Sequence, residues 1–400
     1  MLLKSIGAVL IITGTAVGAG MLAIPLVTAS FGFSIATALL LFCWAVMLIT
    51  ALWILEVNLG FPKEASFSTM AAKTTGALGA VLTWVSMCLL LYSLCAAYIT
   101  GGSGLLDHLS GLIFNAPWPH NLCVILFTLF FGGFVFFGTR SVDYLNRVLM
   151  FIKLGSFFIL SALAMPYVQK SLLFPTDVTQ LNIIHGNIKN ICYAIPILMT
   201  SFGFHVVIPS LRAYIGDYPV RLKWIVISGC TLPLLIYFLW AISTLGVLPV
   251  EGDNSLVHIT NTGGSVGEMV SALQHVVHSE WVKIFVNVFT DIAVTTSFLG
   301  VSLSLFDFMK DGLSISKKNK LGSVLTWLLV FIIPALIALF YPDGFVKVLG
   351  VASIFVAILL LILPAWMLFK FKPTLSLKLK SLMILIALLG FGVIVLAIGG

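Results

Sequence analysis

The residues best suited to chemistry in this chain are three glycines and a proline in one apolar segment, Ile12–Pro25 (ITGTAVGAGMLAIP). Inside hydrocarbon every backbone N–H and C=O needs a partner, so non-helical backbone at that depth persists only where it is buried or lines a cavity. Gly14 and Gly18 on their own would equally suit the close packing of two straight helices. With Gly20 and Pro25 added, and with a matching segment later in the chain, a broken helix is the better interpretation.

The matching segment is Ile195–Pro209 (IPILMTSFGFHVVIP). Like the first, it runs from a threonine through glycine, here Gly203, to an Ile-Pro pair. Paired segments interrupted by Gly and Pro, at corresponding positions of two halves, indicate the binding site of a transporter with inverted repeats.

A broken helix offers free N–H groups at the start of its second half and free carbonyls at the end of its first half. An amino acid fits this field, with its carboxylate on the amides and its ammonium group on the carbonyls. The expected contacts are Gly18, Ala19, Gly20 and Met21 for the carboxylate, and Thr15, Ala16, Thr200 and Ser201 for the ammonium group.

The elements that carry these segments are membrane helices, because 60% of the residues are hydrophobic and only 9% are charged. At about twenty residues for each span, an all-α integral membrane protein of eleven transmembrane helices is predicted. The expected spans are 5–29, 31–57, 78–104, 121–139, 143–165, 188–214, 221–248, 281–307, 321–341, 344–369 and 381–399. The loop 249–280 is expected to form short helices outside the membrane.

Residues 1–400 are expected to form one integral domain. The interrupted helices are the first and the sixth, and a repeat with an odd number of spans is inverted in its second copy. We therefore predict a 5+5 inverted repeat over approximately 1–168 and 185–370, with 381–399 as an additional helix.

The positive charges indicate orientation, since Lys and Arg concentrate in short cytoplasmic loops. Of the 21 Lys and Arg residues, sixteen fall on the side of the N-terminus, and the other side has only Lys170, Lys189, Lys283 and Lys347. The N-terminus is therefore predicted to be cytoplasmic and the C-terminus to lie on the opposite side. The net charge of +7 is dispersed among these loops, which argues against a nucleic-acid partner.

Other classes of function find little support. All six cysteines fall in predicted spans and no Cys-x-x-Cys spacing occurs, so neither a metal site nor a cofactor is expected. The sequence also has no His-Glu-x-x-His, Gly-x-Ser-x-Gly or Walker-type motif, which argues against an enzyme. A channel needs a continuous polar pore, whereas an internal repeat favours alternating access.

Two charged residues lie about ten residues into predicted spans, Lys153 and Asp291. Charges at membrane depth are rare and costly, and they are functional by default. Lys153 is therefore a candidate for ion or proton coupling, although its long stem would also allow it to reach the membrane surface. Asp291 is too short for that, and it could pair with Lys153.

An aromatic substrate needs a flat apolar slot and one polar partner. Phe204 could supply the slot, and His205 could hydrogen-bond a phenol or titrate during transport. The alternative for His205 is a structural imidazole paired with a carbonyl that the break sets free.

Four segments resemble the hydroxy and aromatic amino acid permease family of the amino acid–polyamine–cation superfamily: GTAVGAGMLAIP (14–25), LEVN (55–58), TSFGFH (200–205) and SFLGVSLSLFD (297–307). The resemblance covers essentially the full length and is strongest to tyrosine-specific permeases. It implies a LeuT-like fold with discontinuous helices 1 and 6, and proton-coupled import of an aromatic amino acid across the bacterial inner membrane. Tryptophan or serine/threonine as substrate, and sodium coupling, remain alternatives.

The resemblance also implies roles for particular residues. In sodium-coupled relatives an ion lies between the first break and helix eight, where this chain has Thr295, Thr296 and Ser297. In some proton-coupled relatives a lysine of helix five takes the place of that ion, and Lys153 resembles it. Helices three and eight flank the breaks in this superfamily, which makes further candidates of Tyr92, Ser93, Tyr98 and Phe298.

Overall fold

The computed structural model describes residues 2–63, 65–175, 188–252, 255–262, 266–277, 279–312, 320–342, 344–372 and 374–399. Over these residues the regular elements are all helices, as predicted. The expected start of the second repeat at residue 185, and Lys317 and Lys318 of a basic loop, lie outside the described residues.

The main elements of the first half of the described chain are six helices. They are α1 (Leu2–Ala16), α2 (Gly20–Thr28), α3 (Gly32–Leu59), α4 (Phe67–Phe114), α5 (His120–Phe136) and α6 (Thr139–Ala164). The short elements η1 (Met165–Tyr167) and α7 (Lys170–Leu173) follow. Within α4, Gly76 has a φ of 75°, so the helix is kinked near its start, before the predicted span 78–104.

The second half contains α9 (Ile188–Ser201), η2 (His205–Val207), α10 (Ile208–Ile215), α11 (Pro219–Leu245), α14 (Glu280–Gly312) and α15 (Lys320–Phe340). The chain continues through α16 (Phe345–Val356), the π-helical turn η3 (Ala357–Ile362), α17 (Leu363–Phe371) and α18 (Leu377–Gly399). The short helices expected between 249 and 280 are present as α12 (Leu256–Thr262) and α13 (Val266–Val277).

Nine helices in the described part of the chain are long and apolar enough to cross a membrane, and the bent pair α1 and α2 makes a tenth. The remaining candidate is α5, which is apolar but only 17 residues long. The chain is therefore a multi-pass membrane protein. The count of eleven spans stays a prediction, because it depends on whether α5 crosses the membrane.

Both predicted breaks are present. Helices α1 and α2 meet at 52° across residues 17–19. Residues 202–204 separate α9 from η2 and α10. Each break ends before its Ile-Pro pair. Pro25 lies inside α2, and Pro209 lies in the first turn of α10. The fixed φ of proline suits a first helical turn, where its missing N–H would have no helical partner.

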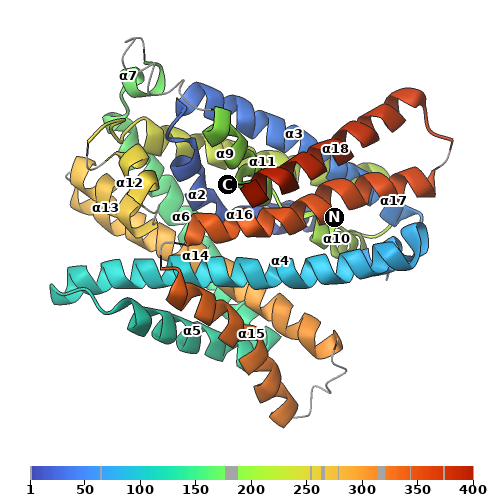
Figure 1. The fold of residues 1–400 in the computed structure, drawn as a ribbon, viewed down its shortest axis with the longest axis horizontal. Coiled ribbons are helices and arrows are strands. Elements are labelled where there is room, and N and C mark those ends of the chain that lie inside the picture. The colour runs from blue at the N-terminus through green and yellow to red at the C-terminus, as the bar shows by residue number, and fades with distance from the viewer. Residues whose placement is uncertain are drawn as a thin grey trace.

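The helices pack in two groups (Figure 1). In one, α1 packs on α11, α2 on α9, and α3 on both α9 and α11. In the other, α4, α5, α14 and α15 pack against one another, and α6 packs on α14. Figure 1 shows α4 crossing the view, with α5 and α15 below it and α3, α9 and α11 above it. Both breaks belong to the first group, and the second group reaches them through side chains of α6 and α14.

Candidate functional site

The glycines of the first break are required by close approach. A Cβ atom on Gly18 would lie 2.4 Å from Ser297 Oγ of α14, and one on Gly20 would lie 3.3 Å from Ser201 Oγ of α9. Neither glycine has a positive φ, so the need is for space and not for a left-handed backbone. The residues beside these glycines are fully buried, with Ala19 and Met21 both 0% exposed.

One amide of the break is held by a hydroxyl. Ala19 N–H donates to Ser297 Oγ at 2.8 Å, and this hydroxyl in turn donates to Ala293 O at 2.8 Å. The neighbouring amides of Gly18 and Met21 are used in local turns, on Ala16 O and Gly18 O. The Ala19 amide, one of the groups predicted to bind a substrate carboxylate, is therefore paired with Ser297.

A tyrosine joins the carbonyls that end the first halves of the two broken helices. Tyr237 of α11 is 0% exposed, and its hydroxyl oxygen lies 2.8 Å from Ala16 O and 2.6 Å from Ser201 O. A phenol has one proton, so it cannot donate to both carbonyls at once. The two carbonyls converge on one point that has more acceptors than donors, which is a place suited to an ammonium group.

The two broken helices also contact each other directly. Ser201 Oγ, at the end of α9, lies 3.1 Å from Gly20 O and 3.1 Å from Ile197 O. One hydroxyl thus links the second half of the first broken helix to the first half of the other.

Lys153 of α6 reaches into the first break. Its ammonium group donates to Val17 O at 2.7 Å and lies 3.3 Å from Thr296 Oγ1. The residue is 1% exposed, so the alternative that it extends to the membrane surface is wrong. Pairing with Asp291 is also wrong, because the ammonium group contacts this carbonyl and this hydroxyl and no ion pair joins it to the Asp291 carboxylate.

The two threonines expected beside an ion differ in their surroundings. Thr296 Oγ1 lies 3.2 Å from Ala293 O, so its hydroxyl can donate there and accept from Lys153. Thr295 is 6% exposed and takes no part in this cluster of hydrogen bonds. Lys153 thus places its positive charge between the break and α14.

His205 lies directly after the second break and is 0% exposed. Its Nε2 lies 2.8 Å from Thr50 Oγ1 of α3, and not against a carbonyl of the break. Thr50 Oγ1 also lies 3.2 Å from Val46 O and 3.2 Å from Met47 O. We assign its single proton to one of these carbonyls, so that the hydroxyl accepts from Nε2. In that tautomer Nδ1 carries a lone pair, and it is buried with no hydrogen-bond partner among the described residues.

Other candidates lie apart from this centre. Tyr92 donates its hydroxyl to Leu329 O of α15 at 3.2 Å, and Phe298 packs against Phe127 and Phe331. The Thr15 side chain is exposed. Thr200 Oγ1 bonds within its own helix, and the Gly203 N–H donates to Thr200 O. Phe204, by contrast, is 0% exposed, and its ring centre lies 5.0 Å from that of His205.

The sequence does not point to Tyr237 as part of this centre. It indicates Ser297 only as a possible cation ligand, and not as the partner of a backbone amide. A buried tyrosine nearly always hydrogen-bonds through its hydroxyl, which is a signal that Tyr237 matters but not a signal of its partner.

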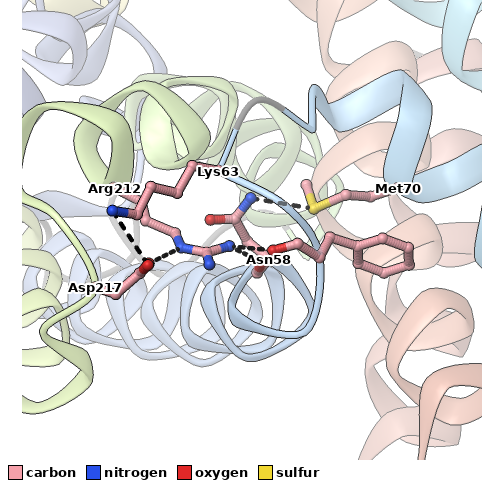
Figure 2. Close-up of polar contacts among 6 residues, drawn as sticks. Asn58, Lys63, Met70, Arg212 and Asp217 are labelled. Atoms are coloured by element: carbon pink, nitrogen blue, oxygen red, sulfur yellow. Dashed lines mark hydrogen bonds and ion pairs between the residues drawn. The ribbon is translucent and has the colours of Figure 1, made fainter.

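A second polar cluster lies at one end of the helices, around Arg212 of α10 (Figure 2). Its guanidinium donates to Asn58 O and, at 2.7 Å, to Phe61 O, so it caps the end of α3. It also donates to Asp217 Oδ1 at 2.7 Å, and Lys63 Nζ lies 3.2 Å from Asp217 Oδ2. The hydrogen bond from Arg212, followed by that from Lys63, holds the pKa of Asp217 below its usual value, so this carboxylate is ionised at neutral pH.

Replacing Arg212 is expected to destabilise the protein. Arg212→Met would remove a buried cationic donor from the carbonyls of Asn58 and Phe61, at a cost of roughly 1.5–3 kcal/mol. The matched control is Lys63→Met, which removes an exposed partner of Asp217 and should lower the melting temperature much less. Thermal unfolding of the purified variants measures the difference, and equal melting temperatures would contradict the capping role.

Comparison with known proteins places the chain. A family profile described as "Tryptophan/tyrosine permease family" matches residues 1–398. Tyrosine-specific transport system 1 of Haemophilus influenzae is 35% identical over 92% of this chain and 88% of its own length. Glutamine transporter 2 of Aliivibrio fischeri is 33% identical over 90% of this chain and 87% of its own length.

Among solved structures, a manganese transporter of Eremococcus coleocola is similar with a TM-score of 0.59, at 14% identity, over 99% of this chain and 85% of that one. At this identity the likeness concerns the fold alone. The relatives in sequence are named as transport systems and not as enzymes. Because the family profile matches nearly the whole chain, and the structure has the two interrupted helices, this chain belongs to the tryptophan/tyrosine permease family.

Proposed function

We propose that this protein is a secondary active transporter that imports an aromatic amino acid, tyrosine, together with protons by alternating access. The observation that carries the proposal is the Tyr237 hydroxyl, which lies 2.8 Å from Ala16 O and 2.6 Å from Ser201 O. These carbonyls end the first halves of the two broken helices, and they are two of the groups expected to hold the substrate ammonium group.

In this interpretation the protein's own side chains take the place of the substrate when it is absent. Ser297 holds the Ala19 amide that would bind the carboxylate, and Tyr237 holds the carbonyls that would bind the ammonium group. An incoming amino acid offers an ammonium group with three donors in place of a phenol with one, so it satisfies both carbonyls. Few polar groups are left unpaired, whether the side chains or the substrate hold the backbone groups. The site with substrate and the site without it are therefore close in free energy.

The orphan nitrogen of His205 favours a substrate with a hydrogen-bond donor on its ring. Nδ1 carries a lone pair in the tautomer set by Thr50, and the neighbouring ring of Phe204 supplies an apolar face. A phenol O–H or an indole N–H could donate to that nitrogen. Sites built to hydrogen-bond one substrate group reject analogues that lack it, so phenylalanine should bind less well than tyrosine.

Coupling is assigned to Lys153. Its ammonium group bonds Val17 O in the first break and Thr296 on α14, and it therefore links the broken backbone to the other packing group. A lysine buried to this degree can release its proton as the surroundings change. In the proposed cycle, protonated Lys153 stabilises the broken segment, and loss of the proton releases it.

The test is uptake of radiolabelled tyrosine into liposomes that contain the purified protein, under an imposed pH gradient and without sodium. Accumulation that tryptophan and tyrosine compete away, and serine or glutamine does not, is the expected result. Uptake only with sodium, or competition by serine or glutamine, would overturn the coupling or the substrate class respectively. Liposomes without protein and a gradient collapsed by an ionophore are the controls.

The membrane and orientation belong to the same proposal. The distribution of Lys and Arg supports a cytoplasmic N-terminus and a periplasmic C-terminus in a bacterial inner membrane. Single cysteines introduced at each end, and labelled from one side of the membrane, test this arrangement.

A further inference from the structure

A groove of about 810 Å³ lies on the outside of the molecule, between α1 and the start of α11. It is separate from the buried breaks. Its floor is apolar, formed mainly by Ile6, Val9 and Leu10 of α1 and by Ile225 and Leu232 of α11. In a membrane protein an apolar groove open at the surface of the helices faces lipid and not water.

The depth of the groove matches one leaflet. Along α11 its lining extends from Pro219 at the helix start to Leu232. At 1.5 Å per residue, this distance is about 20 Å, which equals about half the thickness of a bilayer with its headgroups. Tyr218 and Trp224, 46% and 64% exposed, line its outer part. Tyrosine and tryptophan are typical of the level of the lipid headgroups.

The outer end of the groove is polar and basic. Arg221 and the hydroxyl-bearing Ser5 lie in this part of the lining, and Lys4 precedes Ser5 on α1. Asp217 is the one acidic residue among the described residues of the lining. Its charge is matched by Arg212 at 2.7 Å and by Lys63 at 3.2 Å, as Figure 2 shows. With both partners counted, that cluster carries a net positive charge beside Arg221.

We propose that this groove binds one phospholipid with an anionic headgroup, taken from the leaflet at the N-terminal end of α1. The acyl chain would lie on the apolar floor and the phosphate beside Arg221. An anionic lipid fits the charge of the rim better than a zwitterionic one, because each basic side chain near the membrane surface attracts negative lipid. The bound lipid would pack against α1, the first half of a broken helix. The lipid would therefore contact a segment that borders the break.

Native mass spectrometry of the full chain in detergent tests the site, with phosphatidylglycerol and phosphatidylcholine of identical acyl chains as the two probes. Ser228→Phe would fill the groove from an exposed position, and Ser304→Phe, at an exposed position on α14, is the matched control. We expect one phosphatidylglycerol to be retained by the wild type and by Ser304→Phe, and to be lost from Ser228→Phe.

A second pair of variants tests the headgroup without changing the shape of the groove. Arg221→Gln should weaken phosphatidylglycerol binding about fivefold and leave phosphatidylcholine unchanged. Lys283→Gln, at the N-terminal end of α14 and bonded to Glu280, should change neither.

Three results would overturn the proposal. In the first, Ser228→Phe retains phosphatidylglycerol as the wild type does. In the second, the wild type binds the two lipids equally. In the third, the masses show a dimer that Ser228→Phe converts to monomer, which would mean that a second copy of this chain covers the groove.

Discussion

Lys153→Met is expected to abolish accumulation of tyrosine against its gradient while leaving exchange of tyrosine across the membrane. Lys153 is 1% exposed and its ammonium group bonds Val17 O and Thr296 Oγ1. Methionine fills a similar volume but carries no proton, so the carbonyl of the break loses its charged partner in every state. For a symporter that moves one proton, a gradient of one pH unit supports about a tenfold concentration ratio, and this ratio should fall to about one.

The measurement compares net uptake with counterflow in the same liposomes. Lys310→Met is the matched control, because Lys310 is also buried, at 8% exposed. It lies near the C-terminal end of α14, away from the break, and donates to Ser323. It should accumulate tyrosine as the wild type does. If Lys153→Met still concentrates tyrosine tenfold, Lys153 takes no part in coupling.

Gly18→Ala is expected to reduce kcat/KM for uptake by at least about tenfold. The added methyl group would lie 2.4 Å from Ser297 Oγ and 3.5 Å from Ser297 Cβ. Overpacking of this kind costs about 1–3 kcal/mol of stability. Where that cost falls on the conformation that binds substrate, 1.4 kcal/mol corresponds to a factor of ten in apparent affinity. The clash also pushes on the hydroxyl that accepts the Ala19 N–H, so the geometry of the expected carboxylate site changes with it.

A double variant separates space from hydrogen bonding. Gly18→Ala with Ser297→Ala removes the atom at 2.4 Å and leaves an ordinary contact at 3.5 Å, so the melting temperature should recover towards that of Ser297→Ala. Uptake should recover with it, because in the proposed cycle the substrate carboxylate, and not Ser297, accepts the Ala19 N–H during transport. Gly104→Ala in α4, where a methyl group would meet nothing within 4 Å, is the control. Normal uptake by Gly18→Ala would show that the close approach of α14 is not needed for transport.

The breaks were predictable because they are local. Glycine and proline change the backbone where they stand, and an apolar segment of membrane length makes any interruption conspicuous. The structure confirms both interruptions, at residues 17–19 and 202–204. The membrane class and the choice of Lys153 as a candidate follow from equally local facts, a high share of apolar residues and a charge within a span.

The partners of these groups were not predictable in the same way. Pairing of Lys153 with Asp291 was a reasonable hypothesis from their similar depth, yet Lys153 bonds Val17 and Thr296. Depth in a span follows from position along one helix, whereas contact also depends on how each helix is rotated and on which helix lies opposite.

By itself, then, the sequence determined the membrane-embedded class, the two broken helices and the rare buried lysine, since each depends on residues close together in the chain. Only the tertiary structure decided that Tyr237 meets Ala16, 221 positions away, and that Ser297 meets Ala19, 278 positions away. It also decided that Arg212 caps α3. Such contacts depend on the packing of helices from both halves of the chain, and no periodicity within a single helix encodes which surface it will meet.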